Sequence, residues 1–274
     1  MLASGSIKVR SIVGFVAVLG LICGTWVFAQ EAPQGQAQGQ GRGGRGGGAG
    51  AAGGAAARGG GGGGGAQRAA TAALVLKVEW VRPASQTAQT AVVQENIADT
   101  NLELKQYGAA KQVLTSGTPG SATAPFSVWT GECEGPFAIT FRDKNNFVDL
   151  SGVSKIRWTT KTSGFHVVRP VVKLADGTML VGEYTEYHVP MLTLTEFSLS
   201  GMRWIKLDPA RAVTVSSGGG AGAGLGANEI WVINPDLTKV DEVGFADLMP
   251  ASGHGTGGYV HVAGIEVYGR PVPR

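Results

Sequence analysis

The fold is decided by two stretches of sequence that follow one pattern: Asp149-Leu150-Ser151-Gly152-Val153-Ser154-Lys155-Ile156 and Asp236-Leu237-Thr238-Lys239-Val240-Asp241-Glu242-Val243. An aspartate side chain accepts hydrogen bonds from the backbone of the residues that follow it, so Asp-Leu-Ser/Thr predicts a tight turn. The apolar residues four and seven positions further on are expected to seat the returning chain on a core. Each stretch is therefore predicted to lead into a strand.

Strand patterns dominate the chain on either side of these stretches. Leu74, Leu76, Val78 and Trp80 alternate with more polar positions, as do the residues of 102–105 and 137–141, and no segment shows a sustained helical period. The segments 165–174 and 178–184 flank an Asp-Gly pair, which accepts positive φ at little cost and predicts a hairpin. These features predict an all-β, antiparallel sandwich.

The second stretch continues through Gly244-Phe245-Ala246-Asp247 and leads to Tyr259-Val260-His261-Val262-Ala263-Gly264-Ile265-Glu266-Val267-Tyr268-Gly269. From Asp149 onward, this succession resembles the galactose-binding-like β-sandwich superfamily, which includes carbohydrate-binding modules and the complex I intermediate-associated protein family. The resemblance implies a jelly-roll sandwich that binds sugars more often than it catalyses. Many relatives carry Asp or Asn just before the final strand. Because Ala263-Gly264 stands there, no calcium or ligand role of that position is carried over.

The N-terminal segments predict a compartment and a tether. Lys8 and Arg10 precede an apolar stretch at 12–28, which indicates an export signal at 1–29, cut after Ala29. An uncleaved anchor is the alternative, since the stretch approaches the ~20 apolar residues that span a bilayer. Both place the remainder outside the cytoplasm, as a secreted, periplasmic or cell-surface protein. Residues 30–70, rich in Gly, Ala, Gln and Arg, are predicted to be a disordered tether.

The remaining residues, 71–274, are predicted to form one β-sandwich domain with a glycine-rich loop at 216–228. An N-terminal subdomain at 71–125 is the alternative. Six of the 23 basic residues and one of the 20 acidic residues precede Leu74, so 74–274 holds 17 basic and 19 acidic residues, a net charge of −2. We therefore expect no nucleic-acid partner, and membrane contact only if the N-terminal segment is uncleaved. Cys133 alone would remain after cleavage, so no internal disulfide is predicted.

Motifs for catalysis and metal binding are weak. The sequence has no Gly-x-Ser-x-Gly elbow, no His-Glu-x-x-His helix and no cysteine pair for metal binding. Glu183 and Glu186 are the tempting carboxylate pair of a glycosidase, but their odd separation puts them on opposite faces of one continuous strand, so no catalytic residue is predicted. His254 is a candidate metal ligand that Asp247 and His261 could join. The sequence offers no third ligand at the spacing of a known metal motif, so no metal site is predicted. We expect no cofactor; a structural calcium ion stays an open alternative, although no motif supports it.

Sugar binding requires a flat aromatic ring and side chains that hydrogen-bond hydroxyl groups. Trp158 and Trp204 sit beside aliphatic residues in strands and are expected in the core. The predicted carbohydrate-binding residues lie mainly on and after the Asp-Gly hairpin; they are Tyr184, Tyr187, His188, Glu183, Arg169 and Trp129.

Three functions follow from these patterns. The first is an exported, non-catalytic module that binds a polysaccharide or glycoside. The second is a hydrolase acting on glycans or glycosides, and the third is a structural or assembly protein without a small ligand. Exposed aromatic rings in a groove would favour the first, a deep pocket with paired acids the second, and a broad dry apolar patch the third.

Overall fold

The computed structural model describes residues 72–87, 89–217, 228–249 and 258–274. The predicted export signal and tether, and the centre of the glycine-rich loop, lie outside these residues, so those predictions stay predictions. Within the described ranges, no helix has the length and apolar character needed to cross a membrane.

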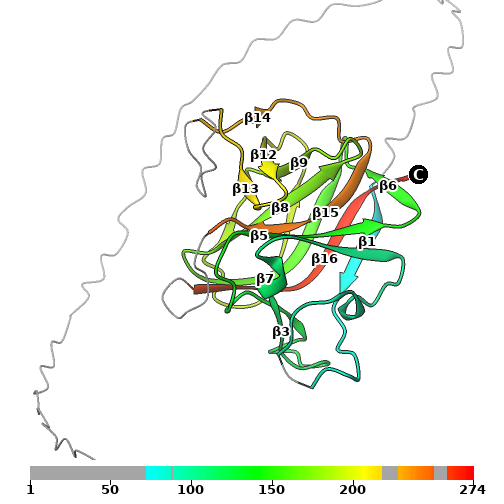
Figure 1. Cartoon of the computed structure of the whole chain (residues 1–274). Coiled ribbons are helices and arrows are strands. Elements are labelled where there is room, and N and C mark those ends of the chain that lie inside the picture. The colour runs from blue at the N-terminus through cyan, green and yellow to red at the C-terminus, as the bar shows by residue number, and fades with distance from the viewer. Residues whose placement is uncertain (1–71, 88, 218–227, 250–257) are drawn as a thin grey trace, which may run out of the picture. The chain divides into compact units, whose positions relative to one another are not determined.

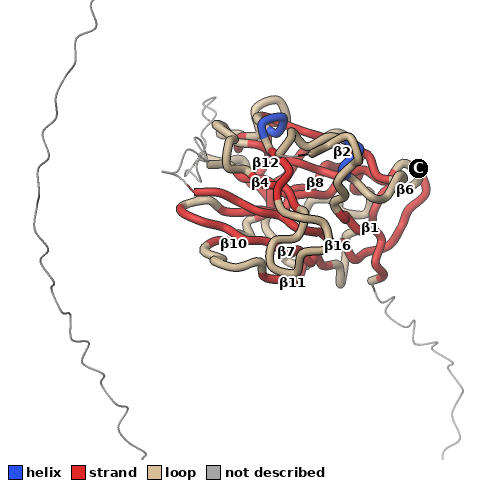
Figure 2. The backbone as a smooth tube through the Cα atoms, turned by 90° about the horizontal axis from the view of Figure 1, so that it is seen from below, coloured by secondary structure: helices blue, strands red, loops and turns tan. Residues whose placement is uncertain are grey.

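The strands form two antiparallel layers, which we call the first and second sheets, and a shared strand links them into one continuous hydrogen-bonded network (Figure 1). Figure 2 shows β8 and β12 in one layer, with β7 and β11 in the other. The first sheet contains β1 (Ala73–Glu79), β3 (Leu114–Ser116), β4 (Ser127–Trp129), β7 (Lys155–Gly164), β11 (Thr193–Ser198) and β16 (Gly258–Pro273). The second contains β2 (Leu102–Gly108), β5 (Phe137–Asp143), β8 (Val167–Leu174), β9 (Met179–Gly182), β12 (Trp204–Asp208), β13 (Val213–Thr214), β14 (Trp231–Val232) and β15 (Val240–Asp247).

The strand order is that of a jelly roll. In the first sheet the neighbours run β4–β16–β7–β11, and in the second β5–β15–β8–β9. The chain therefore crosses from sheet to sheet between β4 and β5 and between β7 and β8, as in double-sheet jelly rolls. The predicted all-β sandwich is confirmed. Because β1 pairs with β16 and β2 pairs with β5, residues 73–108 extend the same two sheets.

Strand β16 connects the two sheets. One of its edges pairs with β7, and the other pairs with β4 and then with β1. Its last residues pair with β6 (Asn146–Asp149), whose Val148 also faces Val240 of β15. The short strand β10 (Glu186–Tyr187) pairs with the start of β8. Two 3-10 turns, η1 (Gln94–Asn96) and η2 (Ala110–Gln112), complete the described elements.

The main core lies between the sheets and draws its large side chains from both, and a second cluster of buried residues, which includes Met179 and Ile205, is separate from it. Trp158 and Trp204 are 1% and 0% exposed, which confirms the prediction that they are core residues. Each fully buried large apolar side chain contributes about 1.5–3 kcal/mol. The Cys133 side chain is fully buried, and its thiol lies 3.3 Å from the carbonyl oxygen of Gly135. The other largest buried side chains are Leu102, Phe137, Ile139, Phe141, Leu150, Ile156, Met179, Leu180, Leu199 and Phe245.

The predicted hairpin is present as β8 and β9. Gly177 has φ +87°, and Asp176 accepts a hydrogen bond from the Thr178 amide at 2.8 Å. The left-handed conformation explains the glycine at this position.

Both predicted entry turns lead into strands, β7 and β15. Ile156 and Val240 are fully buried as expected. Val153 contradicts the expected spacing, because it is 64% exposed. The turn at Gly152, with φ +73°, directs Val153 outward, and Leu150, 1% exposed, packs into the core instead.

Candidate functional site

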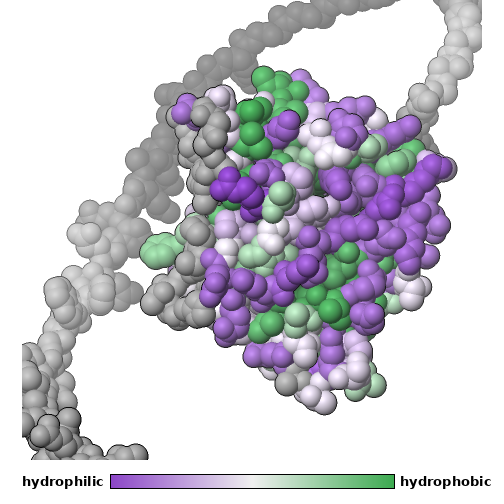
Figure 3. Space-filling view, in the orientation of Figure 1, coloured by the Kyte–Doolittle hydropathy of each residue, from purple (hydrophilic) through white to green (hydrophobic). Residues whose placement is uncertain are grey.

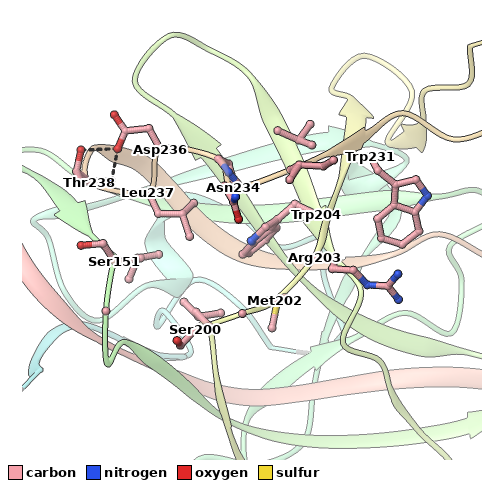
Figure 4. A pocket seen from close by; sticks show the side chains of 17 residues that line it. Ser151, Ser200, Met202, Arg203, Trp204, Trp231, Asn234, Asp236, Leu237 and Thr238 are labelled. Carbon is pink, nitrogen blue, oxygen red and sulfur yellow. Dashed lines mark hydrogen bonds between the residues drawn. The ribbon is translucent and has the colours of Figure 1, made fainter.

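A pocket of about 760 Å³ lies where three turns meet the segment after β14 (Figure 4). Its walls come from the two Asp-Leu-Ser/Thr turns, from the turn 199–203 between β11 and β12, and from residues 231–235. We call this cavity the twin-turn pocket. Its volume falls within the range of small-molecule sites.

The two entry turns are built alike and lie side by side. Oδ1 of Asp149 accepts hydrogen bonds from the Ser151 amide at 2.9 Å and from its hydroxyl at 2.6 Å. Oδ1 of Asp236 accepts the matching pair from Thr238, at 3.0 and 2.6 Å. The two Asp-Leu-Ser/Thr turns, which were predicted as strand entrances, therefore also form one wall of the pocket.

The pocket has an apolar floor. Trp204, Leu150 and Leu199 are at most 2% exposed, and Leu237 and Val232 pack against the same core. The indole nitrogen of Trp204 is buried without a hydrogen-bond partner. The Trp204 side chain is 0% exposed, so it contributes apolar surface beneath the floor and its indole nitrogen is not accessible from the cavity.

Trp231 forms the opposite wall from the turns, with Arg203 beside it (Figure 4). Trp231 is 40% exposed, and the Arg203 guanidinium lies 4.8 Å from the centroid of its ring. Arg203 also donates to Glu183, from Nε at 2.6 Å and from its amide at 3.0 Å. Although partial burial raises the pKa of Glu183, these bonds outweigh it and lower the pKa. The positive charge of Arg203 is therefore already paired with the carboxylate of Glu183.

Asn234 projects into the middle of the pocket (Figure 4). Its backbone has φ +49°, a conformation that Asn tolerates better than most residues. A carboxamide offers both a donor and an acceptor, so it can bind two neighbouring hydroxyl groups at once. Next to it, Figure 3 shows a hydrophobic patch over β14, where Ile230 and Ile233 are 37% and 85% exposed.

Carboxylates are few in the described lining of the pocket. Its described lining contains one carboxylate, Asp236, whose Oδ1 is engaged by Thr238. Glycoside hydrolysis uses two carboxyl groups that flank the scissile bond. Glu183 and Glu186, the pair weighed from the sequence, have separate partners: Glu183 bonds to Arg203, and Glu186 accepts from Tyr184 at 2.9 Å.

Tyr184 is partly buried rather than free on the surface. Its ring stacks on Phe197, with centroids 4.0 Å apart and planes 12° apart, and it also contacts Trp158. Burial and the hydrogen bond to Glu186 raise the pKa of its hydroxyl. Phe197 therefore covers one face of the Tyr184 ring, and a sugar cannot stack on that face.

The other predicted carbohydrate-binding residues lie in separate surroundings. Tyr187 is 66% exposed on β10, and the exposed His188 follows it with φ +55°. Arg169 is 3% exposed on β8 and donates twice to the carbonyl oxygen of Gly182, at 2.7 and 3.0 Å. Trp129 lies on β4, with its ring near His261 of the first sheet. Of the predicted set, only Glu183 hydrogen-bonds to a side chain in the described lining of the pocket, and sugar binding by every member of the set stays a prediction.

The histidines and carboxylates considered for metal binding do not converge. Asp247 Oδ2 lies 2.7 Å from His166 Nδ1, and both side chains are 1% exposed. His261 is near Ser127 instead, and His254 lies outside the described residues. Among the described residues, no cluster of three or more His, Cys, Asp or Glu side chains could hold a metal ion.

A buried polar cluster lies on the face of the second sheet that points away from the core. Glu242, 2% exposed, accepts hydrogen bonds from Tyr107 at 2.7 Å, Thr140 at 2.5 Å and Lys173 at 3.0 Å. Its oxygens are engaged within the protein by side chains of three strands of this sheet, β2, β5 and β8.

Sequence reasoning missed Trp231 and Asn234 as site residues. The available signal was the Asn234-Pro235 pair directly after a short apolar strand, since Asn-Pro favours a turn that exposes its side chains.

No family model and no curated protein matches the chain. Among solved structures, the family 11 carbohydrate-binding module of the cellulosomal cellulase Lic26A-Cel5E of Clostridium thermocellum is 15% identical, with a TM-score of 0.37 over 68% of this chain and 97% of that chain. The Clostridium thermocellum family 11 module in complex with a β-1,3-1,4-mixed-linked tetrasaccharide is 15% identical, with a TM-score of 0.36 over 69% and 100% of the two chains. PfGH50B is 10% identical, with a TM-score of 0.33 over 64% and 23%. These neighbours include carbohydrate-binding modules, as the sequence resemblance implied, but at these values the likeness carries no argument about ligand or activity.

Proposed function

We propose that the domain binds a neutral polysaccharide in the twin-turn pocket. The observation that carries the proposal is the exposed Trp231 ring at the wall of a cavity whose floor is buried and apolar. The C–H face of a pyranose stacks on such a ring, and the apolar floor accepts the opposite side of the sugar.

The polar groups of the pocket support an uncharged ligand. Asn234 offers a donor and an acceptor, and the hydroxyl groups of Ser200, Ser151 and Thr238 line the same cavity. The charge of Arg203 is paired with Glu183. An anionic ligand would have to compete with that carboxylate, whereas neutral hydroxyl groups need no counter-ion.

The composition of residues 1–70 supports a further part of the proposal, that the domain acts outside the cytoplasm. The single lining carboxylate supports binding without hydrolysis.

Affinity electrophoresis and calorimetry with soluble neutral glycans test the proposal. Mixed-linkage β-1,3-1,4-glucan is a practical first probe, with other neutral glucans and mannans beside it. Trp231→Ala should weaken binding by about 1–3 kcal/mol, and stability should hardly change because the ring is exposed. Asn234→Gly should also weaken binding, because it removes the amide and keeps a residue that accepts positive φ.

Tyr187→Ala is the matched control, since it removes an exposed aromatic ring outside the pocket. If Tyr187→Ala abolished binding and Trp231→Ala did not, the ligand would occupy the β10 edge predicted from the sequence. Absence of binding to every neutral glycan would overturn the proposal. Release of reducing ends from a bound glycan would contradict the non-catalytic part alone.

A further inference from the structure

A second cavity, of about 470 Å³, lies on the face of the first sheet that points away from the core. Lys161 of β7 and His261 of β16 are register partners, and Ser127 of β4 lies beside His261; these three side chains form its polar floor. Residues 116–125 and 190–192 supply the walls, which include Pro125 and the 72% exposed Met191. The cavity shares no lining residue with the twin-turn pocket.

Lys161 is the only charged residue in the described lining of this cavity. Lys155 on the same strand provides an internal comparison, because both ammonium groups lie over a tyrosine of β16. Lys155 is 4.9 Å from the Tyr268 ring centroid and Lys161 is 5.4 Å from that of Tyr259. Lys155 has a carboxylate partner, Glu196, at 2.9 Å, whereas Lys161 has no ion-pair partner among the described residues.

His261 contributes hydrogen-bonding capacity to the floor rather than charge. Burial and the positive charge of Lys161 lower the pKa of His261 to about 4, so its imidazole is neutral at pH 7. Its Nδ1 lies 3.3 Å from the Ser127 hydroxyl oxygen. The cavity thus combines one uncompensated cation, one neutral imidazole and a hydroxyl group.

We propose that this cavity binds the carboxylate of an acidic saccharide, a uronic acid residue, with Lys161 as its counter-ion. The hydroxyl groups of Ser116, Thr123 and Ser127 line the same cavity and match the ring hydroxyls of a sugar. Pro125 and Met191 offer apolar contact to the ring. These hydroxyl groups favour a saccharide over an acidic peptide. The site is independent of the neutral-glycan site proposed above.

Calorimetric titration of the full chain with tri-galacturonate tests the proposal, with its methyl ester as the uncharged probe. Wild-type protein should bind the acid and not the ester. Lys161→Gln should weaken binding of the acid about tenfold or more, because it removes a charge-assisted hydrogen bond. Lys155→Gln should leave binding unchanged, since it removes a cation from the same strand and face but outside the cavity. Trp231→Ala should also leave it unchanged, which separates this site from the twin-turn pocket.

Four outcomes would overturn the proposal. One is an absence of binding by the acid. Another is equal loss in Lys161→Gln and Lys155→Gln, which would indicate general electrostatic attraction. The third is equal binding of the ester. The fourth uses tri-glutamate as an acidic peptide. If tri-glutamate bound as tightly as tri-galacturonate and with the same dependence on Lys161, the assignment of a saccharide ligand would be wrong.

Discussion

The backbone amide of Leu150 donates a hydrogen bond to the carbonyl oxygen of Leu237 at 2.8 Å. The two leucines hold the same position in the two Asp-Leu-Ser/Thr turns, so sequence segments some ninety residues apart are joined at matching points. The bond makes the two strand entrances one structural unit, and that unit forms a wall of the twin-turn pocket.

The two aspartates of this unit should contribute unequally to stability. Asp149→Ala should cost about 1–2 kcal/mol, because Asp149 is largely buried and also bonds to Arg270. Asp236→Ala should cost about 0.5–1 kcal/mol, since Asp236 is bonded only through the exposed Thr238 turn in the described structure. Urea unfolding measures both values. Equal stability of both variants and wild type would show that the aspartates cap nothing.

The leucine of the first turn should matter far more than the valine that follows it. Leu150→Ala should cost about 2–5 kcal/mol, because it leaves a cavity in the core. Val153→Ala should stay within about 0.5 kcal/mol, since Val153 is mostly exposed. Thermal unfolding of the pair tests whether the outward turn at Gly152 is as described. A large loss in Val153→Ala would contradict it.

Glu242 should be one of the costliest polar residues to replace. Glu242→Gln should destabilise the domain by about 2–4 kcal/mol, because an amide group would face the Tyr107, Thr140 and Lys173 donors and leave the lysine without its counter-ion. Glu196→Gln, on an exposed ion pair with Lys155, should cost less than about 1 kcal/mol. Chemical denaturation compares the two, and similar small losses would mean that the buried cluster is dispensable.

His261 should make stability fall between neutral and mildly acid pH. The pKa of His261 is lowered to about 4 in the folded protein, so the unfolded chain takes up a proton near pH 6.5 and the folded chain does not until near pH 4. The stability contribution is complete above pH ~6.5 and declines as pH falls toward ~4, by about 1–2 kcal/mol once solvent exposure is allowed for. His261→Gln should show a shallower decline when unfolding is measured at pH ~7 and pH ~4.5. An unchanged slope would show that the imidazole is solvated.

A separate acid effect is expected from the carboxylates at the ends of the sheets. Burial raises the pKa of Asp149 and of Asp241, but hydrogen bonds from Ser151 and Arg270 to the first, and from Arg274 and Arg142 to the second, lower both overall. Their contribution is present above their usual pKa and is lost as pH falls through the lowered values. Asp241→Asn should therefore reduce the loss of stability at the most acid pH and leave the His261 window unchanged.

Local patterns predicted the fold well because they act over few residues. The Asp-Leu-Ser/Thr turns, the Asp176-Gly177 hairpin and the period-two strands each depend on backbone geometry within a handful of positions. Val153 departs from the expected spacing because Gly152 adopts positive φ, which a generic i+4 rule ignores.

The candidate site was harder to predict, because its residues meet only in three dimensions. Tyr184 is covered by Phe197, a contact across the sandwich edge that no spacing within the sequence specifies. Trp231, Asn234 and Arg203 converge from different turns, and the pairing of Arg203 with Glu183 decides the charge of the pocket. Residue type could nominate aromatic candidates, whereas exposure and neighbours had to come from the tertiary structure.

Strand β16 also determines the order in which the sandwich can be completed. It is the shared neighbour of β7, β4 and β1, and through β6 it reaches the second sheet. The partner of Tyr268 in β1 is Leu74, so closing the first sheet joins segments from the two ends of the domain. Contacts of such long sequence separation require loop closure before they contribute stability, which slows folding. During synthesis, the edges of β1, β4 and β7 that pair with β16 therefore have no partner strand until residues 258–273 have been made.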